Sequence, residues 1–310
     1  MQNSLVIKPK TKKIYKSNKL NNANFETFNH SDYQVFLSLL SKIGGVDEKG
    51  KYVQPENLER EYSLTASEFG NIFKLASSHC YTTLKKAVDR LLKADIKIKE
   101  PDNPHHYSRI NICSKAKYMK NEGRIDIKFT DDIMPYLAQV KEKFTIYNLK
   151  EVSNFSSLYT TRMYELIQEF KETGWMIKSI DQLREAFAVG EKYKHYGHFK
   201  SKTFSVACDE INRHYAMGLQ FEEIKEGKKV KAIRFFFKKT IVHEVTNQYT
   251  GKTKNFYEKP EQRISEKPRR IRKKVKNNFN SQTPKKDKKK EEKTLKKRGI
   301  FSSFFSKIFR

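Results

Sequence analysis

The chain has 310 residues, of which 64 are Lys or Arg and 36 are Asp or Glu, so its formal net charge is +28. An excess of this size favours a polyanionic partner. The sequence has no apolar run near the roughly 18 residues of a membrane span, no signal-peptide core and no C-x-x-C pair. These features argue against a membrane protein, a secreted protein and a zinc-binding module, and they predict a cytoplasmic protein.

The charge is concentrated at the two ends of the chain. Residues 1–20 contain six Lys and no acidic residue, and residues 259–310 contain 20 basic and five acidic residues. We therefore expect a basic N-terminal arm at residues 1–20 and a basic low-complexity tail at residues 241–298, both disordered. The apolar periodicity of a folded core is confined to the region between them.

Residues 21–145 show three helical patterns followed by alternating strands. Capping boxes at Ser31-x-x-Gln34 and Thr65-x-x-Glu68 open the first two helices. A third helix is expected from about Ser78 to Ala94, and a turn at Asn121-Glu122-Gly123 joins the later strands. Three helices followed by a small hairpin predict a winged helix.

The third helix of a winged helix enters the DNA major groove. Here its buried stripe is expected to contain Tyr81, Leu84, Val88 and Leu91. Its outward side chains, which are the candidate DNA contacts of this domain, are His79, Thr82, Thr83 and Lys86. A solvated helix face is an equal alternative.

The same architecture recurs over residues 146–240. Ser156 or Ser157 caps a helix that ends before Gly174, and Ser179-x-x-Gln182 caps a short second helix. A longer third helix is expected from about Phe199 to His214, followed by a hairpin with a Glu226-Gly227-Lys228 turn. The predicted fold class is therefore α+β, with two tandem winged-helix domains between disordered basic termini.

The second domain carries the stronger candidates for DNA contact. Basic and small polar side chains gather at the N-terminal end of its third helix, where the helix dipole favours phosphate. Those candidates are Lys194, His195, His198, Lys200, Ser201, Lys202 and Ser205, and Lys228 and Lys229 join them near the hairpin tip. The alternative is again a solvated face.

Residues 299–310 have a pattern of their own. Ile300, Phe301, Phe304, Phe305, Ile308 and Phe309 recur at helical spacing, which predicts a short amphipathic helix. One interpretation is docking on an anionic membrane surface or in a groove of a partner protein. The alternative is a tail that packs on its own domain or on nothing.

Motifs of catalysis are missing from the sequence. It contains no G-x-x-x-x-G-K-[ST] loop, and the pairs His105/His106 and His195/His198 lack the His-hydrophobic-His spacing of rolling-circle nucleases. Tyr81 and Lys85 fit Tyr-x-x-x-Lys, but Tyr81 is expected in the core. We therefore expect no enzyme, no catalytic residues, no metal and no cofactor.

Several short segments, taken in order, resemble the replication initiators of iteron-containing plasmids. The resemblance runs from about Lys16 to Lys238, with one departure: Ser201 stands where members often carry the first of two basic residues. It rests on Lys16-Ser17-Asn18-Lys19-Leu20, Phe144-Thr145-x-Tyr147-x-Leu149, Ser157-x-Tyr159-x-x-Arg162-x-Tyr164-Glu165-Leu166, Gly174, Ile177, Leu183-Arg184, Tyr193, Phe199-Lys200 and Glu210-Ile211-Asn212.

The resemblance implies a protein that binds directly repeated double-stranded sites at a plasmid origin and helps to open the adjacent A·T-rich DNA. It also implies that both domains contact DNA, that a homodimer in equilibrium with the monomer represses its own gene, and that the host replicative helicase and initiator ATPase are partners. The alternatives are a winged-helix transcriptional repressor and, from another class, a rolling-circle nicking enzyme.

Overall fold

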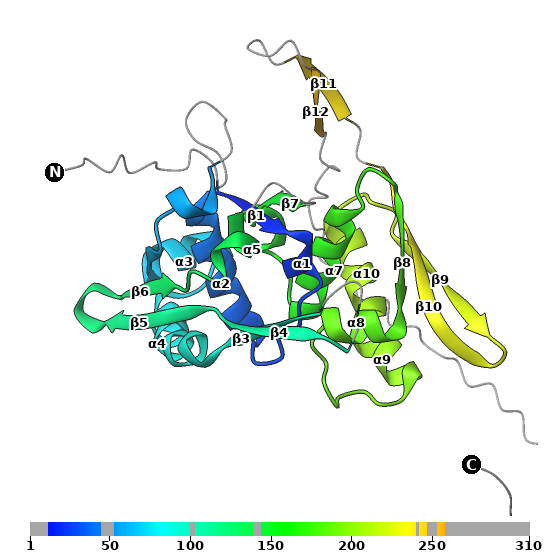
Figure 1. The fold of residues 1–310 in the computed structure, drawn as a ribbon, viewed down its shortest axis with the longest axis horizontal. Helices are drawn as coiled ribbons and strands as arrows, with labels where there is room; N and C mark the ends of the chain where they lie inside the picture. Colours follow the sequence, from blue (N-terminus) through cyan, green and yellow to red (C-terminus); the bar gives the residue numbers. More distant parts are fainter. Residues whose placement is uncertain are drawn as a thin grey trace, which may run out of the picture. The chain divides into compact units, whose positions relative to one another are not determined.

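The computed structural model describes residues 12–44, 53–99, 103, 105–138, 144–239, 242–246 and 253–257. Within these residues the chain forms two winged-helix domains, called WH1 and WH2 below (Figure 1). The N-terminal part of the expected arm, most of the expected tail and the amphipathic segment 299–310 lie outside the described residues.

WH1 is a helical layer packed on one antiparallel sheet. The sheet has the strand order β2-β6-β5, and its inward side chains, among them Leu64, Ile125 and Ile127, are buried against the helices. The domain contains α2 (His30–Ile43), η1 (Pro55–Asn57), β2 (Glu61–Thr65), α3 (Ala66–Phe73), α4 (Ser77–Lys93), β5 (Cys113–Met119), η2 (Lys120–Glu122), β6 (Arg124–Phe129) and α5 (Met134–Ala138). A separate hairpin of β3 (Asp95–Lys99) and β4 (Tyr107–Asn111) is inserted after α4.

WH2 repeats this arrangement with a sheet of strand order β8-β10-β9. Its core includes Met176 and Phe235 from the strands and Phe199 and Phe204 from the helices. The domain contains α6 (Leu149–Val152), α7 (Leu158–Glu169), β8 (Trp175–Ser179), α8 (Ile180–Ala186), α9 (Tyr196–Lys202), α10 (Phe204–His214), β9 (Gln220–Glu226) and β10 (Lys229–Phe236). The repeat predicted from the sequence is therefore confirmed.

Two stretches expected to be unstructured have secondary structure. Strand β1 (Lys13–Ser17) pairs antiparallel with β7 (Phe144–Asn148), and α1 (Asn18–Asn21) follows it. The expectation of a solvated arm is therefore wrong from residue 13 onward, because this strand supplies buried side chains to the junction of the domains. The strands β11 (Val242–Thr246) and β12 (Thr253–Tyr257) form a hairpin at the start of the expected tail.

The caps of the helices largely follow the sequence pattern. Thr65 and Ser179 cap α3 and α8 in reciprocal capping boxes, and Ser157 caps α7. The prediction of a capping box at Ser31 is wrong, since the N-cap of α2 is Asn29, two residues earlier. The Asn29 side chain accepts a hydrogen bond from the Asp32 amide at 2.9 Å, while the Asp32 carboxylate accepts one from the Asn29 amide at 3.1 Å.

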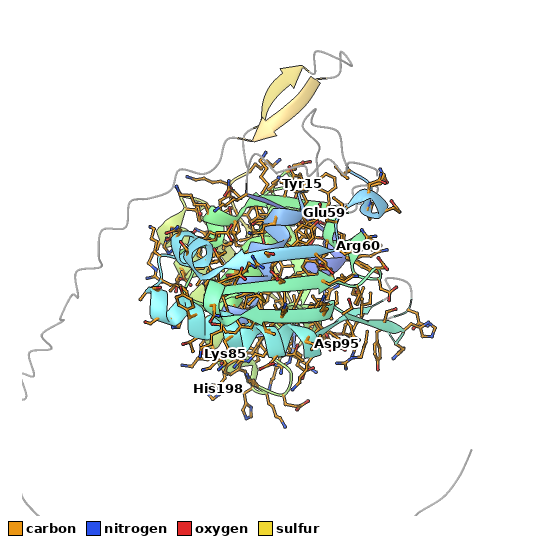
Figure 2. The ribbon with its side chains drawn as sticks, turned by 90° about the vertical axis from the view of Figure 1, so that its left-hand side faces the viewer. Tyr15, Glu59, Arg60, Lys85, Asp95 and His198 are labelled. Atoms are coloured by element: carbon orange, nitrogen blue, oxygen red, sulfur yellow. The ribbon has the colours of Figure 1, made fainter. Side chains whose placement is uncertain are left out.

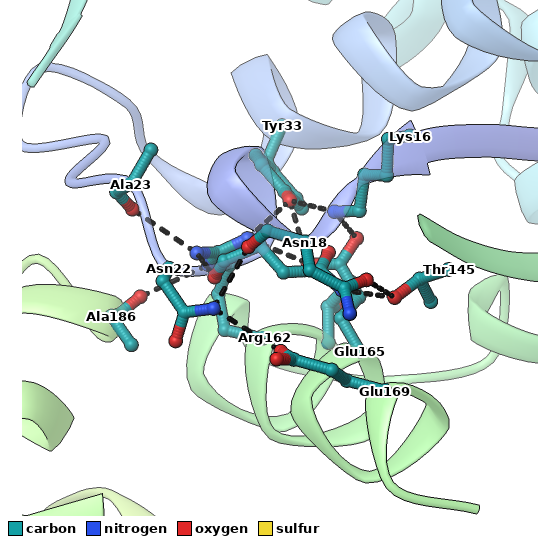
Figure 3. Close-up of polar contacts among 12 residues, drawn as sticks. Lys16, Asn18, Asn22, Ala23, Tyr33, Thr145, Arg162, Glu165, Glu169 and Ala186 are labelled. Carbon is teal, nitrogen blue, oxygen red and sulfur yellow. Dashed lines mark hydrogen bonds and ion pairs between the residues drawn. The ribbon is translucent and has the colours of Figure 1, made fainter. Parts of the chain in front are cut away.

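A buried ionic cluster joins the two domains (Figure 3). On α7, Arg162 and Glu165 form an ion pair at 2.7 Å, and Glu165 also pairs with Lys16 of β1 at 2.5 Å. Tyr33 of α2 lies between them, donating to Glu165 at 2.7 Å and accepting from Arg162 at 2.8 Å. We call Lys16, Tyr33, Arg162 and Glu165 the junction cluster.

The remaining donors of Arg162 are also satisfied. Its guanidinium donates to the backbone carbonyls of Asn21, Ala23 and Ala186, the last at 3.0 Å. Since Asn21 and Ala23 belong to the N-terminal segment and Ala186 ends α8, one side chain binds both domains. A buried charge is tolerated only when it is paired and hydrogen-bonded in this way.

The cluster also determines the ionisation of its members. Burial lowers the pKa of the Lys16 ammonium, and the neighbouring Glu165 opposes this effect. Burial alone would raise the pKa of Glu165, but the two cations Lys16 and Arg162 outweigh it and hold that pKa below its ordinary value. Glu165 is therefore the carboxylate that neutralises the junction.

We expect Glu165→Gln to reduce the free energy of unfolding by roughly 3–5 kcal/mol, because Lys16 and Arg162 then stay buried without a counter-charge. Urea unfolding followed by circular dichroism measures this loss. The control is Glu222→Gln, which breaks a half-exposed ion pair with Arg234 and should cost less than about 1 kcal/mol.

The stability difference between wild type and Glu165→Gln should depend on pH. Because the pKa of Glu165 is lower in the folded protein than in the unfolded chain, its stabilisation is present above the unfolded pKa and is lost as the pH falls through the folded pKa. The stability difference between wild type and Glu165→Gln should therefore shrink in acid. A difference that stayed constant down to about pH 3 would contradict this assignment.

Candidate nucleic-acid interface

The WH1 recognition helix α4 presents a mixed polar surface. His79, Thr82 and Lys86 are exposed, as predicted, and Lys85 is exposed beside them. Thr83 is buried, so its prediction as a DNA contact is wrong. The buried stripe contains Cys80, Thr83, Leu84, Ala87, Val88 and Leu91, which are positions i, i+3, i+4, i+7, i+8 and i+11 of one helix face.

The prediction of Tyr81 as a core residue is also wrong. Its side chain is 43% exposed because Cys80, one position earlier, begins the buried stripe. The ring instead lies over the turn between β5 and β6. A Cβ atom added to Gly123 would overlap the Tyr81 ring, and Gly123 has φ +56°, so only glycine suits this position. Tyr81 thus packs the recognition helix against the hairpin.

The helix expected from Phe199 to His214 is two helices, α9 and α10, because the helical backbone is interrupted at Thr203. The Thr203 backbone has φ −120° and ψ −97°, and its hydroxyl donates to the Phe199 carbonyl at 2.6 Å. In a continuous helix, Phe199 and Phe204 would point about 140° apart. The break lets both rings enter the core, where their centroids are 5.7 Å apart.

The DNA contacts predicted for the third helix of WH2 lie in different environments. Lys194, His195, His198, Ser201 and Lys202 are exposed or partly exposed, and Ser205 is half-buried on α10. Figure 2 shows His198 at the same lower edge of the molecule as Lys85 of α4. Both recognition helices therefore present polar side chains toward one side of the folded chain.

Lys200 is the half-buried lysine of this set, whereas Lys194 and Lys202 are exposed. Its ammonium pairs with Glu223 of β9 at 2.9 Å and lies 5.3 Å from the centre of the Phe221 ring. Tyr196 donates to the same Glu223 carboxylate at 2.7 Å. The hydrogen bonds from Lys200 and Tyr196 lower the pKa of Glu223 to about 2, so this carboxylate stays ionised at neutral pH. Lys200 therefore fastens α9 to its own hairpin.

The hairpins supply further cations. Lys228 and Lys229 are exposed at the tip of the WH2 hairpin, as predicted, next to Gly227 with φ +59°. In WH1 the exposed lysines Lys115, Lys117 and Lys120 lie along β5 and its turn, and the sequence-based prediction missed them. The alternation of Lys115 and Lys117 before the Asn121-Glu122-Gly123 turn was the signal that could have found them.

The described residues were compared with the requirements of a metal site and of a membrane span. Among them there is no group of three or more side chains able to hold a metal ion. None of the helices within the described ranges is long and apolar enough to cross a membrane. What these residues do offer is two exposed recognition helices, each beside a lysine-bearing hairpin, which is the arrangement by which winged helices bind duplex DNA.

Comparison with known proteins assigns the family. The model described as Initiator Replication protein, WH1, matches residues 13–168, and the model described as Initiator Rep protein, WH2, matches residues 179–237. The chain belongs to the initiator replication protein family. Together the matched ranges take in both winged-helix domains of this initiator, and the first range starts at β1.

Two curated relatives come from Escherichia coli. The initiator is 26% identical over 218 residues to a PI protein, a match that covers 59% of this chain and 71% of the relative. It is 25% identical over 170 residues to a replication initiation protein, a match that covers 54% of this chain and about half, or 48%, of that relative. A crystal structure of the Pi initiator protein in complex with iteron DNA shares the fold at a TM-score of 0.58 and 23% identity, covering 74% of this chain and 98% of that one.

We expect Gly123→Ala to lower stability by more than about 1 kcal/mol, because alanine is strained at positive φ and its methyl group meets the Tyr81 ring. The matched control is Gly227→Ala, which has a similar φ of +59° but nothing within 4 Å of the added carbon. Thermal unfolding should rank Gly123→Ala below Gly227→Ala, and Tyr81→Ala should remove the difference. Equal losses would contradict the contact between helix and turn.

Proposed function

We propose that this protein is a plasmid replication initiator that binds directly repeated double-stranded sites at an origin and promotes opening of the adjacent A·T-rich DNA. The observation that supports it most is the family match over both winged-helix domains. A relative named as a replication initiation protein and a fold neighbour bound to iteron DNA agree with it.

In this proposal, α4 and α9 read bases in successive major grooves while the two hairpins contact the backbone. The candidates in WH2 are Lys194, His198, Ser201, Lys202, Ser205, Lys228 and Lys229, and those in WH1 are His79, Thr82 and Lys86. Lys200 has a second role, because in the unbound protein it is paired with Glu223.

Opening of the origin requires no bond to be broken by the protein. Contacts in two tandem domains release counter-ions from the phosphates and supply binding free energy, part of which deforms the DNA. A·T-rich sequence lowers the cost of this deformation. We therefore propose a binding protein without catalytic residues, metal or cofactor, acting in the cytoplasm.

We further propose that the initiator exchanges between monomer and homodimer and represses its own gene as a dimer. The host replicative helicase and initiator ATPase would act after the repeats are occupied. A winged-helix repressor is the main alternative, since it begins with the same contacts. A rolling-circle nicking enzyme is the alternative from another class, and Tyr81 is exposed beside Lys85. A covalent Tyr81–DNA adduct that forms with a divalent metal and is absent in Tyr81→Phe would support this alternative.

The decisive experiment is footprinting of the purified protein on DNA flanking its own gene, at about 150 mM salt to suppress non-specific attraction. We expect several evenly spaced protected repeats beside an A·T-rich stretch. A single inverted repeat over the promoter would indicate the repressor. Salt-sensitive coating of every fragment would contradict the assignment of the recognition helices.

We expect Lys202→Ala to weaken binding to these repeats and to reduce the slope of log affinity against log salt by about one, as for the loss of one phosphate contact. Lys128→Ala, on the outer face of the WH1 sheet and paired with Glu61, is the control and should leave the slope unchanged. If both variants behave as wild type, Lys202 does not contact the backbone.

Glu223→Gln should raise affinity for the same DNA and increase the salt slope, because it frees the ammonium groups of Lys200 and Lys225, both paired with Glu223, for phosphates. Glu222→Gln is the matched control, since it removes the same charge from the neighbouring position of β9 without touching Lys200. Equal gains in the two variants would mean that only the net charge matters.

A further inference from the structure

WH1 contains a two-stranded hairpin that the winged-helix fold does not need. Strands β3 and β4 are inserted between α4 and β5, whereas in WH2 residues 215–219 connect α10 directly to β9. In Figure 1 the hairpin lies between α4 and α8, and the Lys99 ammonium pairs with Glu185 of α8 at 2.9 Å. The insertion therefore extends from the recognition helix of WH1 to WH2.

The two faces of this hairpin differ in character. Ile96 and Ile98 of β3 are buried, so the residues that alternate with them point the other way, together with their direct partners on β4. This outer side consists of Asp95, Lys97, Lys99, Tyr107, Arg109 and Asn111. We call these six residues the hairpin face. Three of them are cationic and one is acidic, so the formal charge of the face is +2.

Contacts with neighbouring elements fix the position of the hairpin face. The Asn24 amide donates to the Lys97 carbonyl at 3.0 Å, and the Lys97 amide donates to the Asn24 carbonyl at 3.3 Å. The Arg109 guanidinium donates two hydrogen bonds to the Asp95 carboxylate, yet its side chain is 58% exposed. Tyr107 is 52% exposed, and the Lys97 ammonium lies 4.1 Å from the centre of its ring. Cations positioned in this way lose less conformational entropy when they bind an anion.

The hairpin lies on the side of the molecule that presents both recognition helices. Figure 2 shows Asp95, the first residue of β3, at the lower side with Lys85 of α4 and His198 of α9. Two helices in successive major grooves on one side of a duplex leave the intervening minor groove facing the protein between them. That groove is bordered by two phosphate strands, and A·T-rich sequence narrows it, which attracts Lys and Arg side chains.

We propose that the hairpin face binds duplex DNA across the minor groove that separates the sites read by α4 and α9. Lys97 and Arg109 neutralise phosphates at the borders of this groove, and Tyr107 supports the Lys97 ammonium. The contact makes affinity depend on the width of the groove, and so on the sequence between the two base-reading sites. This inference rests on the proposed function, because that function places α4 and α9 in successive major grooves.

The test is hydroxyl-radical footprinting of the full chain on a duplex that carries one of its repeats, since this reagent cleaves DNA from the minor groove. We expect wild type to protect the minor groove midway between the α4 and α9 contacts, and Lys97→Ala/Arg109→Ala to lose that protection. The double variant should also bind roughly 30-fold more weakly at 150 mM salt, with a salt slope reduced by about two, as for two lost phosphate contacts.

The matched control is Lys128→Ala/Arg234→Ala, which removes the same two types of cation from the outer faces of the two sheets, where each pairs with a glutamate. It should leave the protection and the slope unchanged. Lys97→Arg/Arg109→Lys keeps both charges and should retain the protection, which shows that the hairpin face acts through its cations.

The outcomes separate this inference from the proposed function. If wild type protects the repeats but Lys97→Ala/Arg109→Ala keeps the minor-groove protection and the wild-type salt slope, the hairpin proposal alone is overturned. Equal losses in the two double-alanine variants would also overturn it, because only the net charge would then matter. A wild type that protects no repeats at all would overturn the proposed function and this inference with it.

Discussion

The junction cluster is the constraint on which the rest of the architecture depends. Arg162, Glu165 and Lys16 are charged groups removed from water, and such groups are stable only if every partner is in place. The partners come from β1, α2 and α7, so these elements must all assemble around one carboxylate. The cluster thereby fixes two similar domains in one arrangement, which their separate apolar cores would leave undetermined.

The residues that carry the family resemblance serve mainly this internal structure. Arg162 and Glu165 form the junction, and Glu210 accepts from the Ser156 amide and the Thr160 hydroxyl. Asn212 exchanges two hydrogen bonds with the backbone of Leu219, at 2.7 Å each. The family pattern is therefore largely a pattern of buried polar contacts. Most exposed side chains on α4 and α9 lie outside this pattern.

Local signals predicted much of the fold, and contacts between distant elements account for what they missed. The capping boxes of α3 and α8 and the turn at Gly123 depend on neighbours within four residues, so the sequence shows them directly. Lys16 reads as a solvated arm residue because its partner Glu165 is 149 positions away. Packing between elements also determines the pairing of Lys200 with Glu223 and the interruption of the helix at Thr203. Hydrophobic periodicity in the sequence does not predict either feature.

The pairing of β1 with β7 also has a consequence for the order of folding during synthesis. Lys13 leaves the ribosome 135 residues before its partner Asn148. At about 5–20 residues per second, β1 waits roughly 7–30 s for that strand. During this interval its edge is unpaired, which for an apolar strand invites aggregation. The lysines of β1 keep the waiting strand hydrated, and Lys16 gains its buried counter-charge only after Glu165 of α7 has been synthesised.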